Sequence, residues 1–374
     1  MPFVTFDLER WQSTWENRVR YNLSESGVHP LSVRELLELA GASADPLLDV
    51  RLGYSQSNGT DLLRSRIAAL YPGASPEQVL VTTGSAEANY VAALGLIEPG
   101  DTVAMLLPNY LQLWGHTQNL GATVRGFPLH EDRGWAPDLE EIRAAIAPGT
   151  KLVVVTNPHN PTGAILADPM RRAILERVTE VGAWLLADEV YIGAEHDGRT
   201  TQSFWGSYDR LVCVAGLSKA YGLPGLRIGW LVAPAKLVAD AWARHDYTTI
   251  GPSGATDHLA ALALEPTVRE RLLARTRAIL RENYPVLGAW LGGFGDTFSW
   301  VPPKAGAICF ARYRAAIPGM DLVERVRASE NTLLVPGEHF GMPGYLRFGF
   351  GNEGADLRHA LASAAAGLRR AFGD

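Results

Sequence analysis

The chain has 374 residues, of which 47% are hydrophobic and 20% are charged, and its formal net charge at pH 7 is −6. This composition is typical of a folded protein, and the length favours two domains packed in one globular unit. The acidic balance and the scattered arginines argue against nucleic acid as a partner. No apolar run is long enough to cross a bilayer and no leader pattern opens the chain, so we expect a cytoplasmic protein with no membrane partner.

Five short apolar runs in the first two thirds of the chain predict buried strands, at 79–82, 103–107, 152–155, 184–187 and 211–215. Helical patterns fill the gaps between them, at 85–96, 138–146 and 169–181. Alternating strands and helices predict an α/β domain with a mainly parallel sheet between helices.

The pattern changes after about residue 266. A long helical stretch covers 268–291, and short strands follow at 307–311, 333–336 and 346–350 before a closing helix at 355–372. We therefore predict a large domain over residues 41–265, and a smaller α+β domain made of residues 1–40 and 266–374.

A polar cluster follows each of the five predicted strands of the large domain. The clusters are Thr83–Ala86, Pro108–Tyr110, Asn157–Gly163, Asp188–Tyr191 and Ser218–Lys219. Ligands of open α/β sheets bind beyond the carboxyl ends of the strands, so one crevice is expected to receive all five clusters.

Three of these segments resemble the class I/II aminotransferases: Asn157–Gly163, Asp188–Tyr191, and Ser218–Lys219 followed by Gly225–Gly229. Each motif alone is weak, but the ordered set is specific, and the resemblance runs from about residue 54 to residue 350. It implies the fold of the fold type I pyridoxal-5'-phosphate (PLP) enzymes, with PLP as cofactor. It also implies an α-amino acid and a 2-keto acid as substrates, and a homodimer with shared active sites.

The resemblance assigns the covalent chemistry to Lys219, which would carry PLP as a Schiff base. Lys219 follows an apolar strand, where burial is expected to lower its pKa and favour the neutral amine, although a lone lysine there is ordinarily a surface residue. The resemblance places Asp188 on the pyridinium nitrogen and Tyr191 and Asn160 on the phenolic oxygen. The alternatives are a helix cap for Asp188 and a turn residue for Asn160.

Phosphate recognition is expected at the helix that opens at Gly84-Ser85-Ala86, since free backbone N–H groups and the helix dipole favour an anion there. The resemblance adds Arg227 and Ser218. Some members of the family have a phosphate-binding serine where this chain has Gly216.

Two tyrosines complete the expected cofactor site. Tyr110 resembles the aromatic residue that stacks on the ring, although a core role is as common for such a residue. Tyr54 matches the segment that reaches the phosphate of a neighbouring subunit.

Arg347, in Tyr-Leu-Arg-Phe-Gly-Phe, is similar to the arginine that binds the substrate α-carboxylate, with Asn160 beside it. The N-terminal turn from Ser24 to Pro30 departs from ordinary aminotransferases. It looks like the turn of the capreomycidine synthases, which cyclise a hydroxyarginine, and like that of the PLP-dependent arginine oxidases. Gly27 and His29 are therefore also candidates for substrate contact, whereas Tyr191 favours transamination.

Other classes of function have little support in the sequence. There is no dinucleotide fingerprint, P-loop, H-E-x-x-H motif or nucleophile elbow, and no metal site is expected. Cys213 and Cys309 lie in apolar runs and are predicted to be core thiols. A non-catalytic binding or regulatory protein of the same fold would not need Lys219, Asp188 and Arg227 together.

Overall fold

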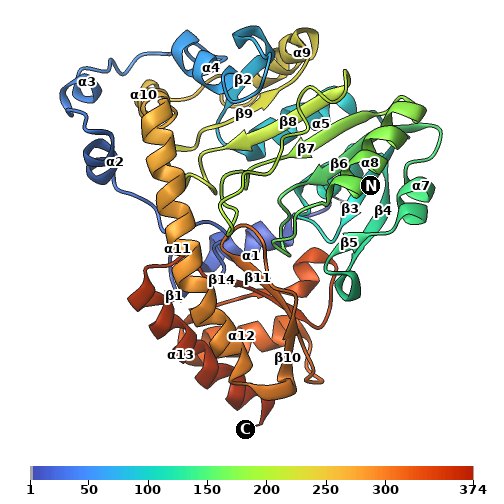
Figure 1. Ribbon diagram of the computed structural model, residues 1–374, viewed down its shortest axis with the longest axis vertical. Coiled ribbons are helices and arrows are strands. Elements are labelled where there is room, and N and C mark those ends of the chain that lie inside the picture. Colours follow the sequence, from blue (N-terminus) through green and yellow to red (C-terminus); the bar gives the residue numbers. More distant parts are fainter. Residues whose placement is uncertain (1–2, 374) are drawn as a thin grey trace.

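The computed structural model describes residues 3–373. Its largest element is an eight-stranded sheet, in the upper half of Figure 1, with the strand order β2-β9-β8-β7-β6-β3-β4-β5. The strands are β2 (Val79–Thr82), β3 (Thr102–Leu107), β4 (Thr123–His130), β5 (Ala136–Pro137), β6 (Thr150–Thr156), β7 (Trp184–Asp188), β8 (Leu211–Gly216) and β9 (Gly229–Val232). All five predicted strands are present, whereas β4, β5 and β9 were not predicted.

The sheet is mainly parallel, as predicted. The pairs β3/β4, β3/β6, β6/β7 and β7/β8 are parallel. β9 is antiparallel to both β8 and β2, so that β2 runs in the same direction as β8. The carboxyl ends of β2, β3, β6, β7 and β8 therefore lie along one edge of the sheet, and the five polar clusters meet there.

Helices cover both faces of this sheet because successive apolar side chains point to opposite faces. Along β6, Val153 and Val155 join one hydrophobic cluster, and Leu152 and Val154 join another. The first cluster is closed by α4 (Asp61–Ala68), α7 (Leu139–Ala145) and α8 (Asp168–Val181). The second is closed by α5 (Ser85–Leu96), α6 (Gln112–Asn119) and α9 (Ala235–His245).

A smaller antiparallel sheet of order β10-β11-β14-β13 lies in the lower half of Figure 1. Its strands are β10 (Phe298–Trp300), β11 (Ile308–Tyr313), β13 (Val335–Pro336) and β14 (Tyr345–Gly349). The helices α12 (Gly319–Glu330) and α13 (Gly354–Phe372) accompany it, and the long helix α11 (Pro266–Gly292) runs from the large sheet towards the smaller one.

The N-terminal segment returns to the C-terminal part of the chain. β1 (Tyr21–Asn22) pairs in parallel with β12 (Thr332–Leu333). The helix α1 (Asp7–Trp15) is held by a hydrogen bond of 2.9 Å from Trp11 Nε1 to the carbonyl oxygen of Leu334, and the Arg327 guanidinium lies 3.6 Å from the centre of the Trp15 ring. In Figure 1, α1 lies between the two sheets.

Short helices connect the remaining parts of the chain. They are α2 (Val33–Ala40), α3 (Asp45–Leu48), α10 (Gly254–Ala263), and the 3-10 turns η1 (Pro76–Gln78), η2 (Glu131–Arg133), η3 (Pro224–Leu226), η4 (Gly295–Thr297) and η5 (Gly337–Phe340). No helix within residues 3–373 is long and apolar enough to cross a membrane.

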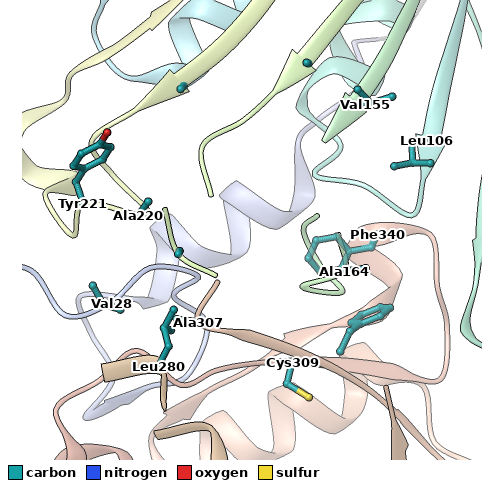
Figure 2. Packing of buried hydrophobic residues seen from close by; sticks show 14 of the residues in the cluster. Val28, Leu106, Val155, Ala164, Ala220, Tyr221, Leu280, Ala307, Cys309 and Phe340 are labelled. Atoms are coloured by element: carbon teal, nitrogen blue, oxygen red, sulfur yellow. The ribbon is translucent and has the colours of Figure 1, made fainter. Parts of the chain in front are cut away.

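One hydrophobic cluster extends from the large sheet into the smaller one. Figure 2 shows Leu106 and Val155, from β3 and β6, above Cys309 and Phe340, which belong to the smaller sheet and its turn η5. Cys213 and Cys309 are both free and buried, as predicted. The continuous core fixes the edge of the large sheet against the smaller sheet, and the candidate site lies at this boundary.

Candidate active site

The helix α5 presents its N-terminus at the carboxyl edge of the large sheet. It begins after Gly84, which has φ +82° and no side chain that could cap the helix. Gly229 lies directly beneath, and a Cβ atom there would overlap the backbone nitrogen of Ser85. This close approach brings the first backbone N–H groups of α5 to the sheet edge, an arrangement that suits an anion.

Arg227 brings a positive charge to the same helix terminus. Its backbone is in the left-handed region at φ +50°, and its Nη1 donates to the carbonyl oxygen of Pro224 at 3.0 Å. A Cβ atom on Gly84 would overlap Arg227 Nη2, so the guanidinium lies against the glycine. The structure therefore joins two of the predicted phosphate contacts, Gly84 and Arg227.

A buried acid fixes the turn before α5. The Glu87 carboxylate accepts hydrogen bonds from the Thr83 backbone N–H at 2.6 Å and from His245 Nε2 at 3.1 Å. Burial raises the pKa of Glu87, but the hydrogen bonds from His245, Thr248 and Thr83 outweigh it and hold that pKa at about 2. The charged carboxylate thus locks the loop that carries Gly84.

A cavity of about 70 Å³ opens beside this terminus and collects most of the predicted site residues. Its lining comes from the large sheet, from the smaller sheet and from the N-terminal segment. The lining residues are Glu9, Gln12, Ser26, Ser85, Ala86, Asn89, Tyr110, Thr156, Asn160, Asp188, Val190, Tyr191, Lys219 and Arg347.

Lys219 forms an ion pair in which Nζ lies 2.9 Å from Oε1 of Glu25. Burial lowers the pKa of the Lys219 amine, but the charge of Glu25, the neighbouring Tyr191 and the hydrogen bond to Glu25 together outweigh burial, and the net pKa is raised. The expectation that burial would leave Lys219 with a lowered pKa is therefore wrong, because the sequence did not reveal that Glu25 contacts it.

Asp188, at the end of β7, is buried without a cationic partner. It accepts hydrogen bonds from the Val190 backbone N–H at 3.2 Å and from Asn89 Nδ2 at 3.4 Å, and it forms no ion pair with any residue in 3–373. Burial raises its pKa to about 6. A cation placed in the cavity would stabilise the charged form of this carboxylate.

Arg347 enters the cavity from the centre of the smaller sheet and is 1% exposed. Nη1 donates to Oδ1 of Asn160 at 2.9 Å, and Nη2 donates to the carbonyl oxygen of Ser24 at 2.5 Å. Its Nε, like the hydroxyl of the buried Tyr191, has no hydrogen-bond partner among residues 3–373. Both groups can therefore bind a ligand in the cavity.

Tyr110 bridges the large sheet and α1. Its hydroxyl donates to Oε1 of Glu9 at 2.6 Å, and its ring packs edge-on against Phe6 with 4.8 Å between the ring centres. The tyrosine that was predicted to stack on a cofactor ring thus lines the cavity and also anchors the first helix over it.

A comparison with known proteins identifies the family. The sequence model of the family described as aminotransferase class I and II matches residues 42–363. The chain belongs to the class I/II aminotransferase family. It is 34% identical to a capreomycidine synthase from Streptomyces vinaceus over 360 residues, which cover 95% of this chain and 92% of that protein.

Solved structures agree with this membership. A PLP-dependent aminotransferase from Streptococcus suis has a TM-score of 0.92 and 34% identity, with 100% of this chain and 99% of that chain covered. The PLP-dependent cyclase OrfR has a TM-score of 0.90 and 31% identity, with 98% of each chain covered. The fold is fold type I of the PLP enzymes, as predicted.

PLP is the cofactor of this aminotransferase-family chain, and the residues of the cavity fit it. The N-terminus of α5 with Arg227 suits a phosphate, and the unpaired buried Asp188 suits a pyridinium nitrogen. The unpartnered hydroxyl of Tyr191 suits an oxygen of the ring, and Lys219 supplies the amine.

Six predicted site residues of this aminotransferase-family chain do not line the cavity: Gly84, Ser218, Arg227, Gly27, His29 and Tyr54. Gly84 and Arg227 lie together at the N-terminus of α5. His29 is hydrogen-bonded to Arg275, which does not line the cavity, with 3.2 Å between Arg275 Nη2 and His29 Nδ1. Gly27 packs its backbone against Ser218 and Lys219, where a Cβ atom would lie 3.1 Å from the Ser218 carbonyl oxygen. Tyr54 is 96% exposed, so any role in the site requires a second chain.

Sequence reasoning missed several residues that line or border the cavity. Glu9 and Gln12 come from α1, Asn89 comes from the second turn of α5, and Glu25 comes from the N-terminal turn. Asn89 could have been found, because it lies one helical turn after the predicted phosphate contact at Ser85. The other three residues carry no local signal.

Proposed function

We propose that the chain is an aminotransferase that uses Lys219 to move the amino group of an α-amino acid to a 2-keto acid. The observation that carries the proposal is that one cavity joins Lys219, Asp188 and Arg347, which come from three separate elements. An amine, a buried acid and a buried arginine are the groups that this chemistry needs at one place.

Bound PLP supplies an electron sink for the bond that breaks at the substrate α-carbon. Asp188 holds a proton on the ring nitrogen, because burial raises the pKa of this carboxylate to about 6 and a neighbouring cation stabilises its charged form. Tyr191 and Asn160 point their polar groups at the same cavity and set the hydrogen bonds to the phenolic oxygen. Arg227 and the backbone N–H groups of α5 bind the phosphate.

Arg347 orients the substrate by its α-carboxylate. The guanidinium is held by Asn160 and Ser24, so that its free donors have a fixed direction. Lys219 would take the α-proton of the bound substrate at Nζ and would later give that proton up again. That step requires the neutral amine, and the ion pair with Glu25 must therefore open first.

A second candidate is a cyclase that acts on arginine or a derivative, as capreomycidine synthases do. It is favoured by the match to such an enzyme over 95% of this chain and by the carboxylates of Glu9, Glu16 and Glu25 around the cavity. Burial, together with the neighbouring charges of Glu25 and Glu9, raises the pKa of Glu16. A cationic side chain would relieve this repulsion.

Half-reactions separate the two candidates. A panel of amino acids that includes arginine and hydroxyarginine is added to the PLP-loaded protein, and conversion of PLP to pyridoxamine phosphate is followed together with oxygen uptake and product mass. Conversion without oxygen loss supports the aminotransferase. A cyclic product from hydroxyarginine with PLP retained supports the cyclase, and oxygen consumption supports an oxidase.

We further propose that two chains assemble as a homodimer with shared active sites. Leu48, Leu52 and Tyr54 are 77%, 99% and 96% exposed, and Tyr247 is 94% exposed. The residues around them, 51–55 and 249–255, line one open cavity. Apolar side chains at such exposure are typical of an interface, and a second chain would bring Tyr54 to the phosphate site of its partner.

A further inference from the structure

Glu25 holds the amine of Lys219 in a fixed place. Its Oε1 accepts a hydrogen bond from the Lys219 amine at 2.9 Å. The same oxygen accepts hydrogen bonds from the backbone N–H groups of Ser26 at 2.8 Å and Gly27 at 3.1 Å. The carboxylate is therefore bound to its own turn as well as to the lysine, and it has little freedom to move away. An exposed ion pair between two long side chains would lack this support.

The turn itself is clamped by glycines. A Cβ atom on Gly349 would overlap the carbonyl oxygen of Glu25, and one on Gly351 would overlap that of Gly27. On the other side, Gly27 packs against the backbone of Ser218 and Lys219. The distance between Glu25 and Lys219 is thus set by close backbone packing between the N-terminal turn, the end of β14 and the loop after β8.

Other charged groups around Lys219 do not replace Glu25. Tyr191, Arg347 and Asp188 line the same cavity, and Glu16 lies farther along the N-terminal segment. Arg347 opposes a charged amine, and Asp188 makes no ion pair with Lys219. Glu25 is the only carboxylate within residues 3–373 that forms an ion pair with this amine.

We propose that Glu25 is a positioning residue for Lys219, which binds the amine whenever the amine is not bonded to the cofactor and releases it for each covalent step. This inference rests on the proposed role of Lys219. Covalent capture joins the neutral amine nitrogen to the aldehyde carbon of PLP, and the aldehyde oxygen leaves as water. The extra proton of the Lys219–Glu25 pair must pass to solvent before this condensation.

The proposal has a consequence that is unusual for the loss of an acidic residue from an active site. The pKa of the Lys219 amine is lowered by burial and raised by Glu25, so the neutral variant Glu25→Gln leaves burial unopposed by that charge. More of the amine is then neutral at pH 7, and PLP should be captured faster. If the pH midpoint of the capture rate falls by about one unit, capture at pH 7 becomes roughly tenfold faster.

The test uses the full chain after removal of PLP. The capture rate is followed by absorbance from pH 6 to pH 11 for the wild type and for Glu25→Gln, Glu25→Asp and Glu16→Gln. Glu16→Gln is the matched control, because it removes a nearby negative charge that does not contact the amine. Thermal unfolding of each variant identifies any general loss of folding.

We expect the pH midpoint of PLP capture to fall by about one unit or more in Glu25→Gln. It should fall less in Glu25→Asp, which keeps the charge on a shorter side chain, and less also in Glu16→Gln. A Glu25→Gln midpoint equal to that of the wild type or of Glu16→Gln would overturn the inference while leaving the role of Lys219 intact. If borohydride traps no PLP on Lys219 of the wild type, the proposed function itself fails.

Discussion

Nη1 of Arg347 donates a hydrogen bond of 2.9 Å to Oδ1 of Asn160, and this contact joins the smaller sheet to the loop after β6 of the large sheet. The arginine is buried at the cavity wall, so water does not compete for this hydrogen bond. The contact fixes the separation between the expected carboxylate clamp and the large sheet that carries the cofactor residues.

The first prediction concerns this arginine. Arg347→Lys keeps the charge but loses the planar pair of donors, so kcat/KM for an amino acid should fall about 100-fold. The control substrate is the matching amine that lacks the α-carboxylate, whose slow reaction should change little. If both substrates lose activity equally, Arg347 supports the fold of the site and does not bind the carboxylate.

Asp188 should make the stability of the PLP-free protein depend on pH. Burial raises its pKa from 3.8 to about 6, so the folded chain binds this proton more tightly than the unfolded chain does. The resulting stabilisation is complete below about pH 4 and is lost as the pH rises through 6.

The variant Asp188→Asn lacks this titration. Between pH 4 and pH 7, its free energy of unfolding in urea should therefore gain about 2 kcal/mol relative to the wild type. Glu189 titrates in both proteins and cancels in the difference. A difference that is flat with pH would mean that Asp188 is not desolvated in the PLP-free protein.

Gly229 should be intolerant of substitution because its missing side chain admits the backbone of α5. Gly229→Ala forces the helix terminus away from the sheet, and we expect a loss of about 2 kcal/mol in stability together with at least tenfold weaker binding of PLP. Gly225→Ala is the matched control, since no atom lies within 4 Å of its added Cβ. Equal effects of the two variants on PLP affinity would refute this account of the phosphate site.

The exposed apolar side chains of Leu48, Leu52 and Tyr54 predict that the protein is a dimer. Leu52→Asp should shift the protein from dimer to monomer in sedimentation velocity and weaken PLP binding, because the partner chain no longer supplies Tyr54. Leu139→Asp changes an exposed leucine on α7 and should leave the dimer intact. A wild-type protein that sediments as a monomer at micromolar concentration would rule out the shared site.

The sequence predicted those features that depend on local patterns. Apolar runs located five strands of the large sheet, and the polar residues after them, such as Asp188 and Lys219, did meet at one edge because the strands run in the same direction. Strand β4 was missed because at most four of its eight residues are apolar and its burial is uneven. Strand β9 was missed because it begins at Gly229, the last residue of the motif around Arg227.

Contacts between distant segments could not be predicted. Glu25 and Lys219 are 194 positions apart, and Tyr110 and Glu9 are 101 apart. Such pairs depend on how the N-terminal segment packs between the two sheets. The periodicity of apolar residues in the sequence does not indicate this packing. The raised pKa of Lys219 was missed for this reason, and the placement of His29 against Arg275 has the same origin.

The central claim is that Lys219 forms the covalent bond with PLP. The most direct measurement is borohydride reduction of the PLP-loaded protein, followed by proteolysis and mass spectrometry of the peptides, with Lys219→Ala as the parallel sample. We predict a single pyridoxyl adduct at Lys219 in the wild type and none in Lys219→Ala, which should still bind PLP reversibly. An adduct on another lysine, or unchanged trapping in Lys219→Ala, would contradict the account.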